Sequence, residues 1–261
     1  MSKKSIWIIN QYASTPDTGM GGRHYYLAKE LAKLGHDVHL IAGSYSHLLK
    51  SPPRVSGDYR FERVDGFKMV WVGVNAYDNA HSKKRIWNWL NFSWKVRKLL
   101  SLIEATPDVV IASSPQPFVF LAAKYLSKKT GAKLVFEVRD IWPLTLIEML
   151  GASRFNPFIA LMQWVEDKAY RESDIVISNL KNSVDHMVKR GMAAEKFVWI
   201  PNGVCLDEME GGAKAPSEIT AMIPPEGFVV GYTGTIGEAN AIHALIEAAR
   251  LLQHDNRIKF V

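Results

Sequence analysis

A cation and a carboxylate stand side by side where an apolar segment ends, in the run from Arg139 to Pro143. Asp140 could accept a hydrogen bond from a ligand hydroxyl or take up a proton. Trp142 could stack on a ligand or pack inside the protein. The alternative is an Arg139–Asp140 pair that closes a loop. We favour a site, because ligands of open parallel sheets bind beyond the carboxyl ends of the strands.

Two glycine-bearing loops have the composition of anion sites. One runs from Gly19 to His24 and the other from Gly231 to Gly237, and each follows an apolar segment and precedes a helical pattern. Glycine lets the backbone approach a ligand, and a helix N-terminus presents free N–H groups to phosphate. Each loop alone could be an ordinary turn. The pair predicts a phosphate-binding cleft between two α/β units.

Another polar loop begins at the end of the segment Asp108–Ser113, which is predicted to be a strand. It reads Ser113-Ser114-Pro115-Gln116-Pro117, which is polar and rigid. Ser114 is therefore a candidate for lining a second ligand pocket. The same residues would also suit the start of a helix, so both interpretations stay open.

Several classes of chemistry lack their motifs. The dinucleotide fingerprint would need glycine at His24, and no acid ends the segment Val38–Ala42. The sequence has no D-x-D, HExxH, CxxC, P-loop or G-x-S-x-G motif. We therefore expect no metal and no cofactor. The one cysteine, Cys205, cannot form an internal disulfide, which favours a reducing compartment.

Charge is unevenly distributed along the 261 residues. The net charge is +6, and the first hundred residues hold 16 Lys+Arg against 7 Asp+Glu. A basic front half suits a phosphate-bearing partner or an anionic membrane surface; a solvated basic face is the alternative. Nucleic acid is not an expected partner.

A basic, tryptophan-rich stretch lies within a helix predicted over Lys84–Glu104. Ile86, Trp89/Leu90, Val96, Leu100 and Ile103 would form the stripe that packs on the sheet. The remaining residues could then rest on a membrane interface, or the tryptophans could be buried instead. The candidates for a membrane surface are Lys83, Lys84, Arg85, Trp87 and Trp94. No window approaches the ~20 apolar residues of a membrane span, and we expect a cytoplasmic protein, peripheral on the inner face of the cytoplasmic membrane if that surface binds lipid.

Short apolar runs alternate with helical patterns, which predicts an α/β fold with a doubly wound parallel sheet. We expect a domain over residues 1–200, a polar linker over 201–226 and the first strand–helix–strand of a second domain over 227–261. The predicted strands of the first domain are Ile6–Asn10, Asp37–Ala42, Phe67–Val72, Asp108–Ser113, Lys133–Val138, Asp174–Ser178 and Phe197–Ile200. The predicted helices include Gly22–Leu34, Phe118–Lys129, Pro157–Arg171 and Leu180–Arg190.

These motifs, in this order, resemble glycosyltransferase family 4, whose GT-B fold has two facing Rossmann-like domains. The likeness runs along essentially the whole chain and is closest to bacterial lipopolysaccharide, capsule and O-antigen sugar transferases. The segments that carry it are Gly21-Gly22-Arg23, Gly35-His36-Asp37-Val38, Arg139-Asp140-Ile141-Trp142-Pro143, Asp174–Ser178, Ile200-Pro201-Asn202-Gly203-Val204 and Gly231–Gly237.

The resemblance implies a retaining, metal-independent transfer from a nucleotide-diphosphate sugar to a saccharide or polyprenyl-diphosphate-linked acceptor. Asp140, with Arg139, would act at the reaction centre, and Ser114 and Trp142 would lie on the acceptor side. The donor would bind to two loops. Their residues are Gly21, Gly22, Arg23, Gly234, Thr235, Ile236 and Gly237.

Two departures from the family pattern affect this prediction. Cys205 stands where the family often has Asp, and the family's E-x7-E donor segment would lie beyond Val261. We therefore expect little transferase activity from this polypeptide alone. Two alternatives remain, namely a sugar-nucleotide epimerase of the same fold and a non-catalytic module that binds a membrane surface or a lipid carrier.

Overall fold

The computed structural model describes residues 2–77, 83–210, 214–237 and 240–261. It divides into two compact units, Met1–Val204 and Cys205–Val261, and each is described by itself.

The first unit is built on an eight-stranded sheet with the order β3-β4-β2-β1-β5-β6-β7-β8. All neighbouring strands pair in parallel except β3 and β4, which are antiparallel. The strands are β1 (Ser5–Ile9), β2 (Asp37–Gly43), β3 (Tyr59–Val64), β4 (Phe67–Val72), β5 (Val109–Ser113), β6 (Lys133–Val138), β7 (Ile175–Ser178) and β8 (Phe197–Trp199).

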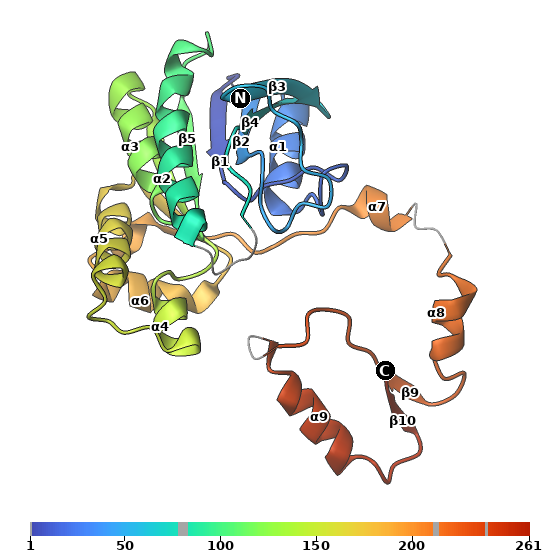
Figure 1. The fold of residues 1–261 in the computed structure, drawn as a ribbon. Helices are drawn as coiled ribbons and strands as arrows, with labels where there is room; N and C mark the ends of the chain where they lie inside the picture. The colour runs from blue at the N-terminus through green and yellow to red at the C-terminus, as the bar shows by residue number, and fades with distance from the viewer. Residues whose placement is uncertain (1, 78–82, 211–213, 238–239) are drawn as a thin grey trace. The chain divides into compact units, whose positions relative to one another are not determined.

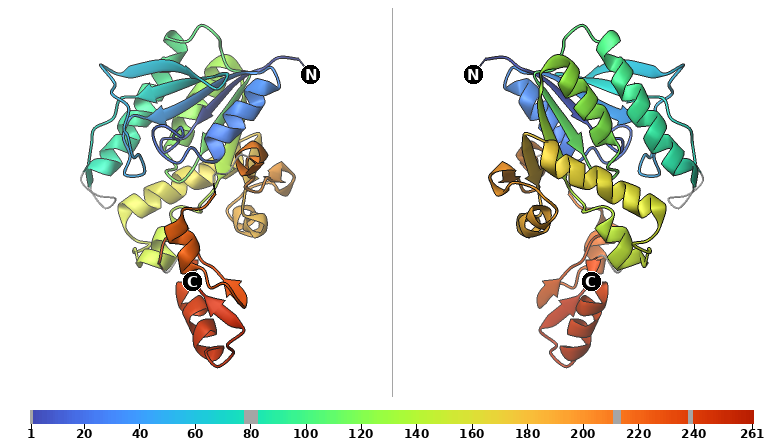
Figure 2. Two further views of the ribbon diagram at one scale, coloured as in Figure 1. Left: turned by 90° about the vertical axis from the view of Figure 1, so that its right-hand side faces the viewer. Right: turned by 90° about the vertical axis from the view of Figure 1, so that its left-hand side faces the viewer.

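Helices cover both faces of this sheet, as Figure 1 shows. Helix α1 (Arg23–Lys33) packs Tyr25 and Ala28 into a core with β2 and β4. Helices α2 (Lys83–Lys98), α3 (Val119–Thr130) and α5 (Pro157–Glu172) lie together on the opposite face (Figure 2). The shorter helices are α4 (Leu144–Leu150) and α6 (Val184–Lys189), with 3-10 turns η1 (Leu99–Ser101), η2 (Lys181–Ser183) and η3 (Ala194–Lys196).

The order of the strands creates a switch point in the middle of the sheet. Strand β1 pairs with β2 on one side and with β5 on the other, so the chain turns in opposite directions from this position. In such sheets the loops that follow the two central strands separate, and ligands bind in the space between them. The residues after β1 and β5 therefore lie where a ligand site is expected.

The predicted doubly wound α/β fold is confirmed, and each predicted strand overlaps an observed one. One strand and one α-helix of the first unit, β3 and α4, were not predicted. Strand β3 joins β4 through Asp65-Gly66, both of which have positive φ angles. The helix predicted over Lys84–Glu104 ends at Lys98 and continues only as η1.

The second unit contains the expected strand–helix–strand order. Strand β9 (Phe228–Val230) pairs in parallel with β10 (Ile258–Phe260), and α9 (Ile242–Leu251) connects them. Helices α7 (Leu206–Glu210) and α8 (Ser217–Met222) precede β9, in the stretch predicted as a polar linker.

Candidate functional site

A buried ionic cluster joins the start of α1 to the ends of β5 and β6. Glu137 lies on β6 with its side chain 1% exposed, and its Oε1 accepts a hydrogen bond from Arg23 Nε at 2.7 Å. His24 Nε2 lies 2.8 Å from both Glu137 Oε2 and Ser113 Oγ. Since a carboxylate can only accept, the proton on His24 Nε2 faces Glu137. Two consecutive residues of α1 thus hold one carboxylate.

The cluster keeps Glu137 ionised. Burial alone would raise the pKa of Glu137, but hydrogen bonds from His24, Ser113 and Arg23 and the charge of His24 lower it well below the ordinary carboxyl range. A buried carboxylate with several donors is negatively charged at neutral pH. It therefore supplies a fixed charge beneath the loop that precedes α1.

Arg23 also fixes the loop after β8. Its NH1 donates to the carbonyl oxygen of Pro201 at 2.6 Å, and its NH2 donates to that of Ile200 at 3.0 Å. NH1 also lies 3.4 Å from Asn202 Oδ1. These contacts connect two of the motifs named above, and they engage the guanidinium with groups of the protein itself. The role of Arg23 in donor binding stays a prediction.

The loop before α1 has the backbone that its glycines permit. Gly21 and Gly22 have φ angles of 69° and 85°, a region that disfavours other residues. Gly22 is the N-cap of α1, so the free N–H groups of the first turn follow it directly. Ser14 Oγ donates to the carbonyl oxygen of Gly21 at 3.3 Å. The donor-binding role of these glycines remains untested.

Ser114 organises the loop that carries Arg139 and Asp140. Its hydroxyl oxygen accepts from the backbone N–H of Arg139 at 2.8 Å and of Asp140 at 3.3 Å. Asn10, directly after β1, donates from Nδ2 to the carbonyl oxygen of Ser114 at 2.9 Å. The exits of β1, β5 and β6 are therefore held together. Asp140 is exposed there, while Nε of Arg139 is buried without a hydrogen-bond partner among the described residues.

An aromatic group surrounds Arg85 beside this loop. The Arg85 guanidinium carbon lies 5.5 Å from the ring centre of Tyr12, 5.2 Å from Trp89 and 5.7 Å from Trp142. Arg85 Nε and Trp89 Nε1 both donate to the Tyr12 hydroxyl, at 3.0 and 2.6 Å. Trp142 meets Trp89 edge to face at 5.8 Å and is partly buried. Trp142 thus packs against protein groups with part of its surface left exposed.

The outer side of α2 carries the two tryptophans expected there. Trp87 is 65% exposed and Trp94 is 52% exposed, whereas Trp89 and Val96 are buried. Lys84 is exposed as well, while Arg85 faces the aromatic group. The expected inward stripe is wrong at Leu90, which is 42% exposed. The side chain of Lys83 lies outside the described part of the chain.

The glycine loop of the second unit follows β9. The Tyr232 hydroxyl donates to the carbonyl oxygen of Thr235 at 2.9 Å, as does Asn240 Nδ2 at 2.7 Å. A Cβ atom on Gly234 would lie 2.7 Å from the Tyr232 hydroxyl, so a larger residue would displace that ring. Ile236 is 82% exposed. The roles of Gly234, Thr235, Ile236 and Gly237 stay predictions, and residues 238–239 lie outside the described ones.

Two features are absent from the residues that the structure describes. No group of three or more His, Cys, Asp or Glu side chains is arranged to hold a metal ion within them. In the same residues, no helix has the length and apolar character needed to cross a membrane.

Sequence reasoning missed Glu137, His24 and Asn10. Glu137 is the one charged residue between Leu134 and Val138, an otherwise apolar run, and this was the signal that a buried partner existed. Its partners His24 and Arg23 lie 113 and 114 positions away in the chain, so the spacing of residues could not identify them.

The chain is similar to known glycosyltransferases in sequence. The model of Glycosyltransferase Family 4 matches residues 18–208. The putative colanic acid biosynthesis glycosyl transferase WcaI of Escherichia coli (strain K12) is 22% identical over 247 residues, which cover 91% of this chain and 60% of the relative. The chain thus spans about three fifths of that relative's length.

Solved structures share the fold. Sucrose-phosphate synthase from Thermosynechococcus elongatus matches with a TM-score of 0.66 at 12% identity, over 99% of this chain and 70% of that one. Arabidopsis thaliana UGT89C1 complexed with UDP has a TM-score of 0.54 at 15% identity, over 98% of this chain and 64% of that one. Anabaena HepE in complex with UDP and glucose has a TM-score of 0.52 at 14% identity, over 99% of this chain and 69% of that one. The expected GT-B fold is confirmed, and because the family model covers more than half of the sequence, the chain belongs to Glycosyltransferase Family 4.

Proposed function

We propose that this chain is the acceptor-side domain (1–200), linker (201–226) and beginning of the donor domain (227–261) of a sugar transferase. It moves a sugar from a nucleotide-diphosphate sugar onto a saccharide or lipid-linked saccharide. The observation that carries the proposal is the family match over residues 18–208. The complexes of HepE with UDP and glucose and of UGT89C1 with UDP support a uridine nucleotide donor. The likeness to WcaI supports a role in bacterial surface polysaccharide synthesis, with lipopolysaccharide and O-antigen as the narrower candidates.

The reaction that we propose is retaining and independent of metal ions. The leaving diphosphate is then stabilised by backbone N–H groups at Gly21 and Gly22 and at the start of α1. Asp140 accepts a hydrogen bond from a sugar hydroxyl. The hydrogen bonds that the backbone N–H groups of Arg139 and Asp140 donate to the Ser114 hydroxyl oxygen hold it in position. Arg23 acts as a positioning residue, since its donors bind Glu137 and the carbonyls after β8.

A transfer assay tests this proposal. The protein is incubated with UDP-sugars and a panel of saccharide and lipid-linked acceptors, and product is measured. We expect Asp140→Asn to lower kcat/KM at least ~100-fold, as for loss of a transition-state contact. Glu30→Gln, an exposed carboxylate of α1, is the control. Full turnover by Asp140→Asn would remove Asp140 from the mechanism, and consumption of the nucleotide sugar without acceptor would indicate an epimerase.

We also propose that α2 rests on the inner face of an anionic membrane. Its sequence, KKRIWNWLNFSWKVRK, contains six Lys and Arg residues and no Asp or Glu. Trp87 and Trp94 are exposed on it, and Lys98 Nζ lies 3.5 Å above the Trp94 ring. Exposed tryptophan beside cations is typical of interfacial helices. Arg85 is left out of this surface, because it contacts Tyr12, Trp89 and Trp142.

Vesicle co-sedimentation tests the membrane surface. Trp87→Ala/Trp94→Ala and Lys84→Glu should each weaken binding to vesicles with anionic lipid by at least ~5-fold, since each exposed cation or aromatic group contributes about 1 kcal/mol or more. Trp199→Ala is the matched control, because Trp199 is 47% exposed on β8. Unchanged binding by both α2 variants would contradict the proposal.

A further inference from the structure

A hollow of about 370 Å³ lies beside the ends of β2 and β4. Small-molecule sites occupy roughly 300–1,000 Å³, so the hollow is large enough for a small ligand. Ser44, directly after β2, and Val74 and Asn75, after β4, are among its lining residues. The strands β2, β4, β1, β5 and β6 are parallel, so the hollow lies at the same edge of the sheet as the loop with Asp140.

The lining of this hollow is polar and offers no unpaired charge. Among its described lining residues only Lys95 is charged, and Lys95 Nζ lies 2.7 Å from both Asp58 Oδ1 and the carbonyl oxygen of Gly73. Asn75 is exposed, and only its backbone takes part in its hydrogen bonds with Asn88. The ring of Tyr45 adds apolar surface to the lining. This chemistry suits an uncharged ligand that has hydroxyl groups and an apolar face, as a sugar ring has.

A row of ring contacts connects the hollow to the aromatic group around Arg85. Tyr45 meets Tyr77 edge to face, with ring centres 5.2 Å apart. The ring of His47 lies 6.2 Å from that of Tyr77 and 6.2 Å from that of Tyr12. Tyr77 is buried, while the other three rings belong to residues with exposed surface. Each of these residues follows β1, β2 or β4, so the row lies along the carboxyl edge of the sheet.

The Tyr12 hydroxyl has a hydrogen that the described residues do not use. Its oxygen accepts hydrogen bonds from Arg85 Nε and Trp89 Nε1, and neither of these groups can accept one in return. A hydroxyl oxygen has two lone pairs, so both are occupied and the O–H group is left to donate. No acceptor for it exists within the described part of the chain. A ligand oxygen can take this bond, which the two donors on the Tyr12 oxygen strengthen.

Tyr12 and Asp140 are held by one group of hydrogen bonds. The backbone N–H of Tyr12 donates to Asn10 Oδ1 at 2.8 Å, and Asn10 Nδ2 donates to the carbonyl oxygen of Ser114 at 2.9 Å. The Ser114 hydroxyl oxygen in turn accepts from the backbone N–H of Asp140 at 3.3 Å. The Tyr12 hydroxyl is therefore placed by the same loops that place the proposed reaction centre.

The order of the strands sets the distance that a ligand must cover. In the order β4-β2-β1-β5-β6, Asp140 follows β6, Tyr12 follows β1 and the hollow lies at β2 and β4. Neighbouring strands are roughly 4.8 Å apart, so three to four spacings amount to roughly 14–19 Å. This is longer than a single sugar ring, and a ligand that reaches from Asp140 to the hollow must contain more than one.

We infer that the acceptor carries an uncharged saccharide of at least two sugar units, which extends from Asp140 past Tyr12 into the hollow beside β2 and β4. The sugar at the reaction centre donates a hydroxyl to Asp140 and accepts the O–H of Tyr12. A sugar further along packs on Tyr45 and bonds the side chain of Asn75. This inference rests on the proposed transferase function and specifies the length and charge of the saccharide that the same domain binds.

A glycan array tests the inference on the 261-residue chain. The array carries neutral and acidic saccharides of one to four sugar units, and bound protein is measured over a range of protein concentrations. We expect neutral saccharides of two or more units to bind at least ~10-fold more tightly than the matching monosaccharides, because only the longer ones fill the hollow.

Variants of the hollow should act on the longer saccharides alone. Asn75→Ala should weaken their binding by ~3-fold or more and Tyr45→Ala by ~10-fold or more, since these changes remove a hydrogen bond and a packing surface. Monosaccharide binding should stay as in wild type. The Asn75 side chain is exposed, so Asn75→Ala keeps the test valid even where Tyr45→Ala impairs folding, which circular dichroism would reveal.

Tyr12→Phe should have a different effect, namely weaker binding of saccharides of every length. In the transfer assay it should raise the KM for the acceptor and leave the KM for the nucleotide sugar unchanged, which a general loss of structure would not do. Tyr125→Phe is its matched control, because it removes a phenol hydroxyl from α3. Tyr125→Phe should bind every saccharide as wild type does.

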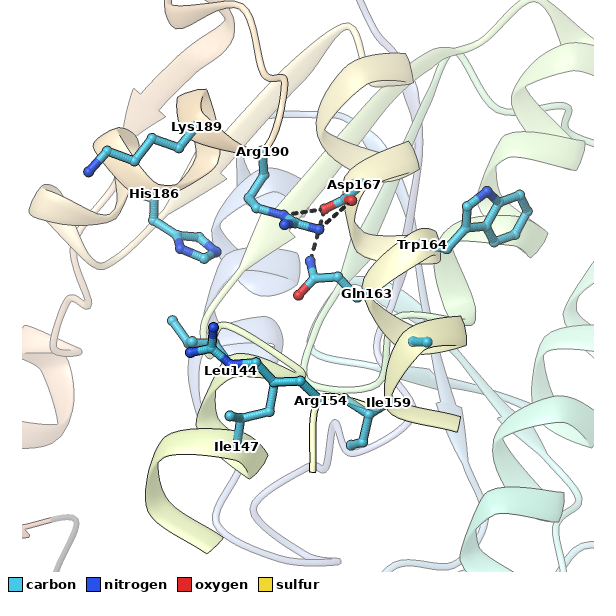
Figure 3. Close-up of a pocket in the computed structure, with 11 residues that line it drawn as sticks. Leu144, Ile147, Arg154, Ile159, Gln163, Trp164, Asp167, His186, Lys189 and Arg190 are labelled. Carbon is cyan, nitrogen blue, oxygen red and sulfur yellow. Dashed lines mark hydrogen bonds and ion pairs between the residues drawn. The ribbon is translucent and has the colours of Figure 1, made fainter. Parts of the chain in front are cut away.

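Trp164→Ala is the matched control for Tyr45→Ala. Trp164 is 50% exposed and lines a different hollow, of about 670 Å³, between α4, α5 and α6 (Figure 3). The cations at that hollow include Arg190, which holds Asp167, and Arg154, which holds Glu148. Loss of the Trp164 ring should leave the binding of all saccharides unchanged.

The inference would be overturned by equal binding of short and long saccharides, by a preference for acidic ones or by an array that binds no protein. Unchanged binding of longer saccharides by both Asn75→Ala and Tyr45→Ala would also overturn it. Failure of the transferase function looks different. Length-dependent binding without any transfer would refute only the transferase, whereas transfer with an unchanged acceptor KM in both variants would refute only the role of the hollow.

Discussion

Glu137 shows how much one residue can organise. The negative charge of a single buried carboxylate selects Arg23 and His24 at the start of α1, and Arg23 in turn fixes the loop after β8. The glycine loop before α1 is therefore anchored by an ion pair whose two sides come from distant parts of the chain. This anchoring reduces the ordering that the loop would need in order to bind the proposed donor.

Removing the charge of Glu137 should destabilise the first unit. We expect Glu137→Gln to lower the free energy of unfolding at pH 7 by about 3–5 kcal/mol, because Arg23 would keep a buried, unpaired charge. Urea denaturation measures this. The pKa of Glu137 is lower in the folded state, so its stabilisation is present above the ordinary value of 4.5 and declines as the pH falls below it toward the folded-state pKa. The difference in the free energy of unfolding between wild type and Glu137→Gln should therefore become smaller as the pH falls.

Glu30→Gln controls for the loss of a carboxylate, since Glu30 is exposed and pairs with Lys33 on the surface. A Glu137→Gln variant as stable as wild type at pH 7 would show that the cluster contributes no net stability.

At the scale of elements, buried strands were predictable and partly exposed ones were not. Strands such as β1 and β5 are almost wholly apolar runs, because parallel strands are covered on both faces. Strand β3 has no fully buried residue and contains Arg60, Glu62 and Arg63, so its composition resembles a loop. The Asp65-Gly66 turn was the available signal, since Asp-Gly is typical of tight hairpins. Helix α4 has no fully buried residue and therefore gave little periodicity.

The candidate site was predictable only where local chemistry defines it. Strand exits and glycine-bearing loops are local features, and these made Ser114, Asp140 and Gly22 candidates whose roles stay predictions. The inward position of Arg85 was not predictable from the local sequence. It depends on Tyr12 and Trp142, which reach α2 only through the tertiary fold.

Helix α5 carries a second buried carboxylate, whose pKa is raised in the folded state instead of lowered. Glu166 is 2% exposed, and burial raises its pKa to about 7, while bonds from Tyr170 and Gln163 oppose the shift. Its folded-state pKa lies above the ordinary 4.5, so the stabilisation is complete below 4.5 and is lost as the pH rises through 7. Wild-type stability should thus fall by roughly 2–3 kcal/mol between pH 5 and 8 from this group.

The variant Glu166→Gln should lack that decline, since glutamine does not titrate. Urea denaturation across the pH range measures how the free energy of unfolding of each protein changes with pH. Glu104 is an exposed carboxylate, so the control Glu104→Gln should keep the wild-type pH dependence. Parallel slopes for wild type and Glu166→Gln would show that Glu166 is ionised in the folded protein at all these pH values.

At the scale of the whole molecule, the two units differ in how they bury apolar surface. The first unit buries the large side chains Trp7, Trp71 and Tyr170 completely. None of the described side chains from Cys205 to Val261 is buried, and Phe228, Ile246 and Leu251 are 70%, 64% and 66% exposed. Because apolar burial is the main source of stability, the second unit has little of its own.

Hydrogen exchange should therefore separate the units in this 261-residue chain. We expect amides of β9 and β10 to exchange at least ~100-fold faster than those of β1, β2 and β5, since a two-stranded sheet is marginal in water. Mass spectrometry of peptic peptides at pH 7 measures both sets in one sample. Residues Cys205–Val261 should also reach full exchange in urea concentrations at which β1 is still protected. Equal protection of β9 and β1 would mean that the second unit gains its stability from contacts outside its own fold.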